Sequence, residues 1–271
     1  MPVKKDQTGK RWVEMELSVP GTPEQVWQAI ATGPGYTAWF TPTTIDERVG
    51  GVIRFDMGEH GESKGEVTAW EPPSRFAYVE RDWGEGAPPL ATEITVTATS
   101  GDQCVIRMVH SLFASTDDWD DQMEGFECGW RGFFKVLRLY LSHFAGMKAA
   151  VAFARTSAEA PQADVWQRLA EGLNLARANA GKEWTVRKPE RMSGMIEHLE
   201  HGDGQCYAVL RMSEPGPGVA LIGSYGMDNS TYVVMTFYLY GEDAKQRAVS
   251  SEPVWRNWSR DTLSTISRSH G

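Results

Sequence analysis

The chain has 271 residues, of which 41% are hydrophobic and 23% charged, a composition typical of globular domains. Its formal net charge of −9 argues against a general nucleic-acid-binding role, because phosphate contacts require a basic surface. Three cysteines without CxxC spacing predict a reducing compartment, and the N-terminus lacks the apolar segment of a signal peptide. No apolar run approaches the roughly 18 residues of a membrane span, so we expect a cytoplasmic protein without a membrane partner.

The first predicted elements are a strand and a short helix. Apolar and polar residues alternate over 12–19, which predicts a half-buried strand. Thr22, Pro23 and Gln25 then form a capping box with proline at the first helical position, so a helix is expected to begin there. This helix carries the sequence Val-Trp-Gln-Ala-Ile-Ala and should end in the Gly- and Pro-containing stretch 32–36.

Antiparallel strands and a long helix complete the first half. The segments 43–57 and 65–83 each predict two short strands joined by a turn, and 92–113 predicts a further hairpin. Over 124–145 apolar residues recur at steps of three and four, which predicts a long helix. Its apolar stripe consists of Phe126, Trp130, Phe133, Phe134, Leu137, Leu141 and Phe144. This order predicts an α+β fold in which a curled sheet and a large helix leave an apolar cavity between them.

Several of these segments, in this order, resemble one family. TPEQVWQAI, RVGGVIRF, GEVTAWEPPSRFAYV and GWRGFF are similar to the START-related helix-grip superfamily, often labelled SRPBCC, over residues 11–146. The most similar branch is the one named for activators of the heat-shock-protein-90 ATPase. The resemblance implies a curved antiparallel sheet that grips a long C-terminal helix. It does not fix one function, because the superfamily includes lipid carriers, polyketide cyclases, hydroxylase subunits and co-chaperones.

The second half contains four features of the first half in the same order, which predicts a tandem repeat. The matched features are Val26-Trp27 with Val165-Trp166, Glu71-Pro72 with Glu214-Pro215, the penultimate hairpin with 230–244, and Trp130-Arg131 with Trp255-Arg256. We therefore expect two helix-grip units, a first domain over 11–146 and a diverged, shorter domain over 149–269. The closing helix of the second domain is expected to open with the sequence PVWRNW at residue 253.

Motifs for metal, cofactor or covalent chemistry are sparse. His198, His201 and Cys206 look like metal ligands, but residues three apart on a strand point to opposite faces, which favours a solvated hairpin and no metal site. The acidic segment 116–125 lacks the spacing of a calcium loop and is expected to be a solvated loop before the long helix. No GxSxG, P-loop, HExxH or dinucleotide motif is present, so no cofactor is predicted.

Candidate site residues therefore come from the face that would surround the cavity. His110 falls on the more apolar face of its strand, so we expect it to point inward, where it is a candidate general base. The residues predicted to bind a ligand are Trp39, Phe40, Trp70, Tyr78, Trp83, His110, Trp130, Phe133, Phe134 and Leu137. Two interpretations stay open for the aromatic residues, which either fill the core or line a pocket.

Three functional hypotheses follow. The leading one is non-catalytic binding of an apolar or aromatic small molecule in the cavity of the first domain. A cyclase- or hydrolase-type enzyme would use the same cavity with His110, Glu80 or Arg81. The third is an interaction protein, either a chaperone regulator or a homodimer. A pocket of roughly 300 Å³ or more with a few converging polar groups favours ligand binding, whereas a filled space favours a scaffold.

Overall fold

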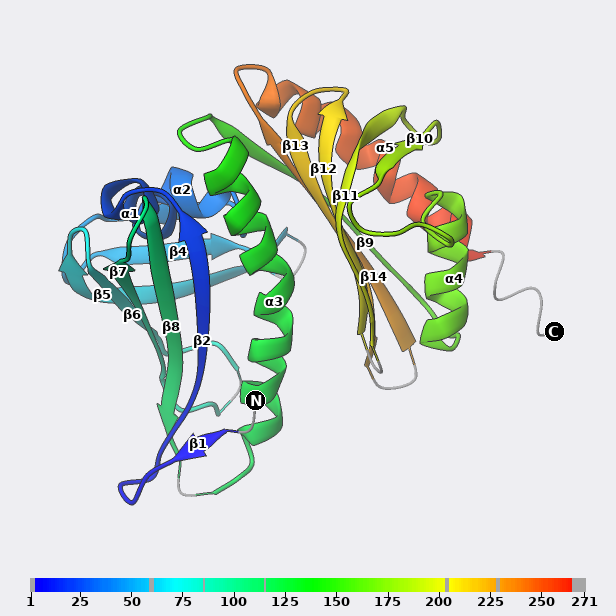
Figure 1. Ribbon diagram of the computed structural model, residues 1–271. Helices are drawn as coiled ribbons and strands as arrows, with labels where there is room; N and C mark the ends of the chain where they lie inside the picture. The colour runs from blue at the N-terminus through cyan, green and yellow to red at the C-terminus, as the bar shows by residue number, and fades with distance from the viewer. Residues whose placement is uncertain are drawn as a thin grey trace. The chain divides into compact units, whose positions relative to one another are not determined.

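The structure is a computed structural model that describes residues 3–58, 61–84, 86–114, 116–202, 205–227 and 230–264, without the side chains of 126–128. The chain divides into two compact units, Met1–Gly146 and Met147–Gly271 (Figure 1). Phe126 of the predicted apolar stripe and the predicted domain end at residue 269 therefore lie outside the described side chains and residues.

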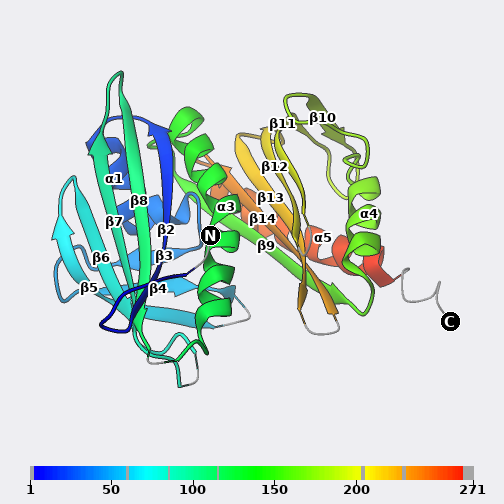
Figure 2. The same ribbon diagram turned by 60° about the horizontal axis from the view of Figure 1, so that its bottom comes forward.

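The first unit combines an antiparallel sheet with helices. Among the described residues the sheet has eight strands in the order β1-β2-β8-β7-β6-β5-β4-β3, so its first long strand pairs with its last. The strands are β1 (Lys4–Lys5), β2 (Lys10–Pro20), β3 (Thr43–Ile45), β4 (Val52–Asp56), β5 (Glu62–Glu71), β6 (Arg75–Glu80), β7 (Leu90–Ala98) and β8 (Gln103–Phe113). The helices are α1 (Pro23–Ala31), α2 (Gly33–Thr37) and α3 (Asp120–His143). Figures 1 and 2 show α3 running across one face of the sheet, where it contacts β2.

The start of the first helix agrees with its sequence signals, but the segment after it does not. Thr22 and Gln25 form the predicted capping box, with the Thr22 amide donating to Gln25 Oε1 at 3.0 Å. The stretch 32–36 was expected only to end this helix, yet it forms the short helix α2. Thr32 explains the difference, because its hydroxyl donates to the Gln28 carbonyl at 2.7 Å and accepts from the Gly35 amide at 3.1 Å. One threonine thus satisfies backbone groups of both helices.

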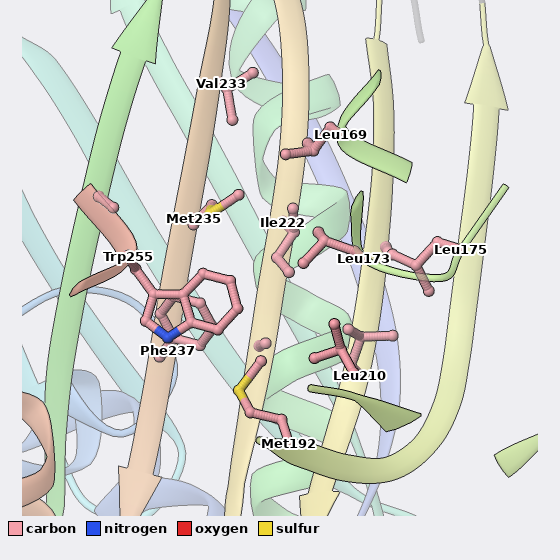
Figure 3. Close-up of a cluster of buried hydrophobic side chains, with 14 of the residues drawn as sticks. Leu169, Leu173, Leu175, Met192, Leu210, Ile222, Val233, Met235, Phe237 and Trp255 are labelled. Carbon is pink, nitrogen blue, oxygen red and sulfur yellow. The ribbon is translucent and has the colours of Figure 1, made fainter. Parts of the chain in front are cut away.

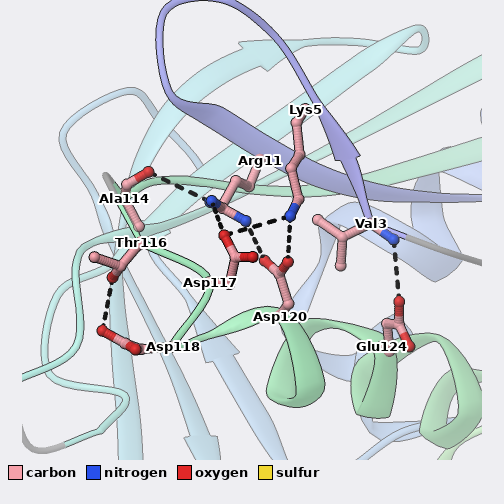
Figure 4. A network of polar contacts seen from close by, with 9 residues as sticks. All are labelled: Val3, Lys5, Arg11, Ala114, Thr116, Asp117, Asp118, Asp120 and Glu124. Atoms are coloured by element: carbon pink, nitrogen blue, oxygen red, sulfur yellow. Dashed lines mark hydrogen bonds and ion pairs between the residues drawn. The ribbon is translucent and has the colours of Figure 1, made fainter.

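A buried arginine anchors the beginning of α3 to the sheet (Figure 4). Arg11 on β2 reaches Asp117 at 2.7 Å and Asp120 at 2.6 Å, and Lys5 on β1 reaches Asp120 at 2.7 Å. The hydrogen bond from Arg11 lowers the pKa of Asp117 below its ordinary value. Most of the acidic segment is exposed, as its composition predicts, but Asp117 and Asp120 are also ion-pair partners of Arg11.

The second unit has the same kinds of elements in a similar order. Among the described residues its antiparallel sheet has six strands in the order β10-β11-β12-β13-β14-β9. The strands are β9 (Ala149–Ala158), β10 (Glu183–Val186), β11 (Met192–Gly202), β12 (Gln205–Glu214), β13 (Gly218–Met227) and β14 (Ser230–Tyr240). The helices are α4 (Gln162–Gly172) and α5 (Ala244–Ser264). The first strand again pairs with the last, as β9 pairs with β14. The predicted α+β class, with antiparallel sheets and closing helices, is confirmed.

The closing helix of the second unit begins earlier than its sequence predicts. The expected start at Pro253 followed from the match of Trp255-Arg256 with Trp130-Arg131 near the beginning of the last helix. In the structure α5 begins at Ala244 and continues through Pro253. Buried residues on both sides of the proline, such as Ala248 and Trp255, hold the helix on the sheet and compensate for the hydrogen bond that proline cannot donate.

A dense apolar core fills the space under α5 (Figure 3). Trp255 is 1% exposed, its ring centroid lies 4.8 Å from that of Phe237, and its Nε1 donates to Glu190 Oε2 at 2.8 Å. Figure 3 shows Met192 and Ile222 among the other side chains of this cluster. Trp255 is thus a packed and hydrogen-bonded core residue.

The predicted tandem repeat fits the two units in part. Trp27 and Trp166 are both buried in the helix that follows the first long strand, as core anchors. The matched proline turns do not correspond. Counted from the strand pairs β2–β8 and β9–β14, the Glu71-Pro72 turn joins the fifth and fourth strands, whereas Glu214-Pro215 joins the fourth and third. A Glu-Pro dipeptide is a common turn sequence, so its recurrence does not identify equivalent hairpins.

Candidate functional site

A cavity of about 440 Å³ lies between α3 and the sheet of the first unit. Its walls come from β4, β5, β6, β7, β8, α3 and the loops that follow α2, β4 and β6. Six of the ten residues predicted from the sequence line it: Phe40, Tyr78, Trp83, His110, Trp130 and Phe133. The structure therefore brings together aromatic residues that are up to 93 positions apart in the sequence (133 − 40 = 93).

The other four predicted residues lie outside the cavity lining. Trp39 is fully buried, and its Nε1 donates to the Ala29 carbonyl at 2.9 Å. Trp70 packs edge-on against Trp27 with ring centroids 5.2 Å apart. Phe134 and Leu137 are buried on α3, where they extend the apolar stripe beyond the part that borders the cavity. Trp39, Phe134 and Leu137 thus belong to the core, and the half-buried Trp70 packs against the core residue Trp27.

One wall of the cavity is aromatic. Phe40 and Trp130 stack with ring centroids 4.6 Å apart and an angle of 25° between the rings. Phe133 meets Phe40 edge-on at 4.9 Å, and Phe55 meets it edge-on at 5.6 Å. Such stacked and edge-on pairs fix the rings in place, so this wall is a preformed apolar surface.

A row of side chains with polar groups crosses neighbouring strands, and Tyr78 and His110 of this row also line the cavity. Tyr78 on β6 pairs in register with Thr92 on β7, and Thr92 pairs with His110 on β8. His110 Nδ1 shares a hydrogen bond of 2.9 Å with the Thr92 hydroxyl, and its ring stacks on Trp130 at 5.6 Å. Burial lowers the pKa of His110 to about 4, so its imidazole is neutral at pH 7. The predicted inward direction of His110 agrees with its exposure of only 3%.

A half-buried carboxylate, Glu80, lies in the wall of the same cavity. The Ser63 hydroxyl on β5 donates a hydrogen bond to Glu80 Oε1. Burial raises the pKa of Glu80, and the hydrogen bond from Ser63 opposes this rise. Arg81, which the enzyme hypothesis paired with Glu80, does not line the cavity, and its guanidinium lies 3.7 Å from Glu66.

Two glycines of α3, Gly125 and Gly129, also line the cavity. They are one helical turn apart, and a Cβ added to either would meet nothing within 4 Å. Sequence analysis missed them because it followed side-chain hydrophobicity, which a glycine does not contribute. The available signal was their position, since a glycine inside a helix costs about 1 kcal/mol relative to alanine and calls for a packing reason.

The two histidines of the predicted hairpin, His198 and His201, have different partners. His201 Nδ1 accepts a hydrogen bond from Trp166 Nε1 at 3.2 Å, whereas His198 Nε2 lies 3.2 Å from Glu200 Oε2. Within the described part of the chain, no three His, Cys, Asp or Glu side chains are grouped to hold a metal ion. None of the described helices is long and apolar enough to cross a membrane.

Comparison with known proteins shows one family to which part of the chain is similar. Residues 20–142 match the family model described as activator of Hsp90 ATPase homolog 1-like protein. No curated protein matches the chain. The Aha1 dimer from Colwellia psychrerythraea is 21% identical over 49% of this chain and 96% of its own, with a TM-score of 0.42. Protein MLL2253 from Mesorhizobium loti is 23% identical over 49% and 98%, with a TM-score of 0.44.

A third solved structure extends over both units. DynU16, from the dynemicin biosynthetic locus, is 16% identical over 93% of this chain and 96% of its own, with a TM-score of 0.43. The family match covers nearly the whole of the first unit, from the end of β2 to the end of α3. Over residues 20–142 the first unit of this chain is thus similar to the family described as activator of Hsp90 ATPase homolog 1-like protein.

Proposed function

We propose that the protein is a cytoplasmic binding protein that holds an apolar or aromatic small molecule, without chemical conversion, in the domain formed by residues 11–146. The observation that carries the proposal is the cavity of about 440 Å³, which is lined by aromatic rings and a few polar side chains. Small-molecule sites usually have volumes of about 300–1,000 Å³, apolar walls and a few polar groups that orient the ligand. The cavity has all three properties.

The polar groups support binding more than catalysis. A general base that works near pH 7 needs a pKa near that pH, and the pKa of His110 is about 4. Its Nδ1 is held by Thr92, and Glu80 accepts a hydrogen bond from Ser63. These groups are suited to forming hydrogen bonds with a bound molecule in an otherwise apolar space.

A variant that fills the cavity tests the proposal. Gly129→Leu places a side chain where the structure has open space, and leucine favours a helix more than glycine does. Native mass spectrometry and tryptophan fluorescence should detect binding of aromatic compounds to the wild type, with at least about a tenfold loss of affinity in Gly129→Leu. Arg138→Leu, on an exposed position of the same helix, is the control and should bind as the wild type does.

Two results would overturn the proposal. One is that no compound of a broad apolar and aromatic panel binds the wild-type protein. The other is that Gly129→Leu, folded by circular dichroism, binds with unchanged affinity. In either case the open space beneath α3 would not be a ligand site.

The predicted macromolecular partners are separate hypotheses. A second copy of the chain is tested by analytical ultracentrifugation, and a heat-shock ATPase by stimulation of its ATP hydrolysis. A monomer at micromolar concentration would contradict the homodimer, and an unchanged ATPase rate would contradict the chaperone partner. Neither outcome affects the cavity.

A further inference from the structure

The cavity of the first unit has an uneven distribution of charge. Three carboxylates line it: Glu62, Glu80 and Asp82. No lysine or arginine is among the described residues that line it. The charge of the exposed Glu62 is compensated, because its carboxylate lies 3.1 Å from both Arg54 and Lys64. Within the described residues, by contrast, no basic group lies within ion-pair distance of Glu80, whose partner is the neutral Ser63 hydroxyl.

The position of Glu80 makes it the deeper acceptor. Glu80 is half-buried on β6, two residues after the buried Tyr78. Burial disfavours its charged form. A carboxylate desolvated in this way gains from a cation brought to it by a ligand, and loses from a second anion. The rings of Phe40, Trp130 and Phe133 line the same space, and aromatic faces attract organic cations as well as apolar groups.

From the cavity, its carboxylate and its aromatic wall together, we infer that the ligand is an amine, with an apolar or aromatic body that lies against Trp130 and Phe40 and an ammonium group that pairs with Glu80. This inference rests on the proposed function and narrows its ligand class. Fatty acids and other carboxylate ligands are disfavoured, because no described basic residue lines the cavity to receive them. A neutral alcohol of the same shape can bind through hydrogen bonds alone.

Three matched compounds test the inference by isothermal titration calorimetry: naphthylethylamine, naphthylethanol and naphthylpropionate. The wild type should bind the amine at least about tenfold more tightly than the alcohol, and the carboxylate least tightly. Glu80→Gln should remove the preference for the amine while keeping affinity for the alcohol. Glu66→Gln, which removes an exposed carboxylate from the neighbouring strand β5, is the matched control and should keep the wild-type preference.

A pH series on the wild type keeps the test independent of the Glu80→Gln variant. Among the described residues, the other titratable groups that line the cavity are Glu62, Tyr78, Asp82 and His110, and Glu80 also acts electrostatically on Tyr36 and Tyr78. Since the pKa of Glu80 is raised by burial, acidification should protonate it and reduce the preference for the amine over the alcohol. Naphthylethylamine keeps its positive charge as the pH is lowered from neutral. The neutral alcohol shows any general effect of pH on binding to the cavity.

The outcomes separate the inference from the proposed function. If amine and alcohol bind equally, or the carboxylate binds most tightly, the amine inference is wrong and ligand binding stands. If none of the three compounds nor any member of the broader panel binds, the proposed function fails as well. If the amine is preferred but the preference survives both Glu80→Gln and acidification, Glu80 is not the partner and the inference is overturned.

Discussion

Replacing His110 with glutamine should make the free energy of unfolding less dependent on pH below about pH 6.5. His110 is 3% exposed, stacked on Trp130 and hydrogen-bonded to Thr92. Burial lowers its pKa from 6.5 to about 4. Because the unfolded chain leaves the imidazole in water, the unfolded state binds a proton at a higher pH than the folded state does.

The sign and size of the effect follow from this difference. Between pH 6.5 and about 4 the unfolded state carries more protons at this site, so the free energy of unfolding falls as the pH falls. Each pKa unit corresponds to about 1.4 kcal/mol, and a shift from 6.5 to about 4 therefore amounts to about 3 kcal/mol. All of that contribution is retained above pH 6.5 and lost near pH 4. Glutamine keeps a polar group for Thr92 but does not titrate.

Urea unfolding between about pH 8 and pH 4, followed by tryptophan fluorescence, measures this effect. Across this range the free energy of unfolding of the unit that contains His110 should fall by about 3 kcal/mol less in His110→Gln than in the wild type. His143→Gln, which removes an exposed histidine from the end of α3, is the control and should follow the wild-type profile. Parallel profiles for wild type and His110→Gln would refute the reasoning, as would an imidazole pKa near 6.5 by NMR titration of the folded protein.

Further predictions concern the elements around the cavity. Arg11→Ala leaves Asp117 and Asp120 without their buried partner, so hydrogen exchange at the start of α3 should accelerate by about tenfold; unchanged exchange would contradict the anchoring role. Gly125→Ala adds a methyl group into open space and should stabilise α3 by about 0.5–1 kcal/mol in thermal unfolding, whereas a loss of stability would reveal a hidden clash. Glu80→Gln should stabilise the ligand-free protein at neutral pH, because the pKa of Glu80 is raised and its ionisation therefore lowers the free energy of unfolding. The gain should vanish below about pH 4.5, where Glu80 is protonated in the folded and the unfolded state. A gain that persists there would have another cause.

The sequence predicted those helix ends and side-chain directions that depend on residues a few positions apart. The capping box of Thr22 and Gln25 and the inward direction of His110 follow from side chains a few positions apart. The pairing of Arg11 with Asp120 joins residues 109 positions apart, and neither the alternation of strands nor the period of helices encodes it. The start of α5 at Ala244 escaped prediction because the match of Trp255-Arg256 with Trp130-Arg131 marks a position inside the helix and not its first turn.

The cavity itself was the part of the site that the sequence could locate but not delimit. The aromatic stripe of α3 predicted which helix borders it, yet only part of that stripe faces open space, and Phe134 and Leu137 are core residues. Which part remains open depends on residues without large side chains. Gly125 and Gly129 have no side chains to fill the space beside α3, and a pattern of hydrophobic residues does not reveal this.

The predicted equivalence of Trp130 and Trp255 shows how similar units acquire different interiors. By that match Val254 of α5 takes the place of Gly129, and Trp255 packs on Phe237 and donates to Glu190, so the space under this helix is filled. In the first unit Trp130 instead stacks on Phe40 at the border of open space. If the two positions are equivalent, the tryptophan is a core residue in one unit and a cavity wall beside a glycine in the other. The open space thus lies beside the closing helix that has glycines at these positions, although both closing helices carry aromatic residues.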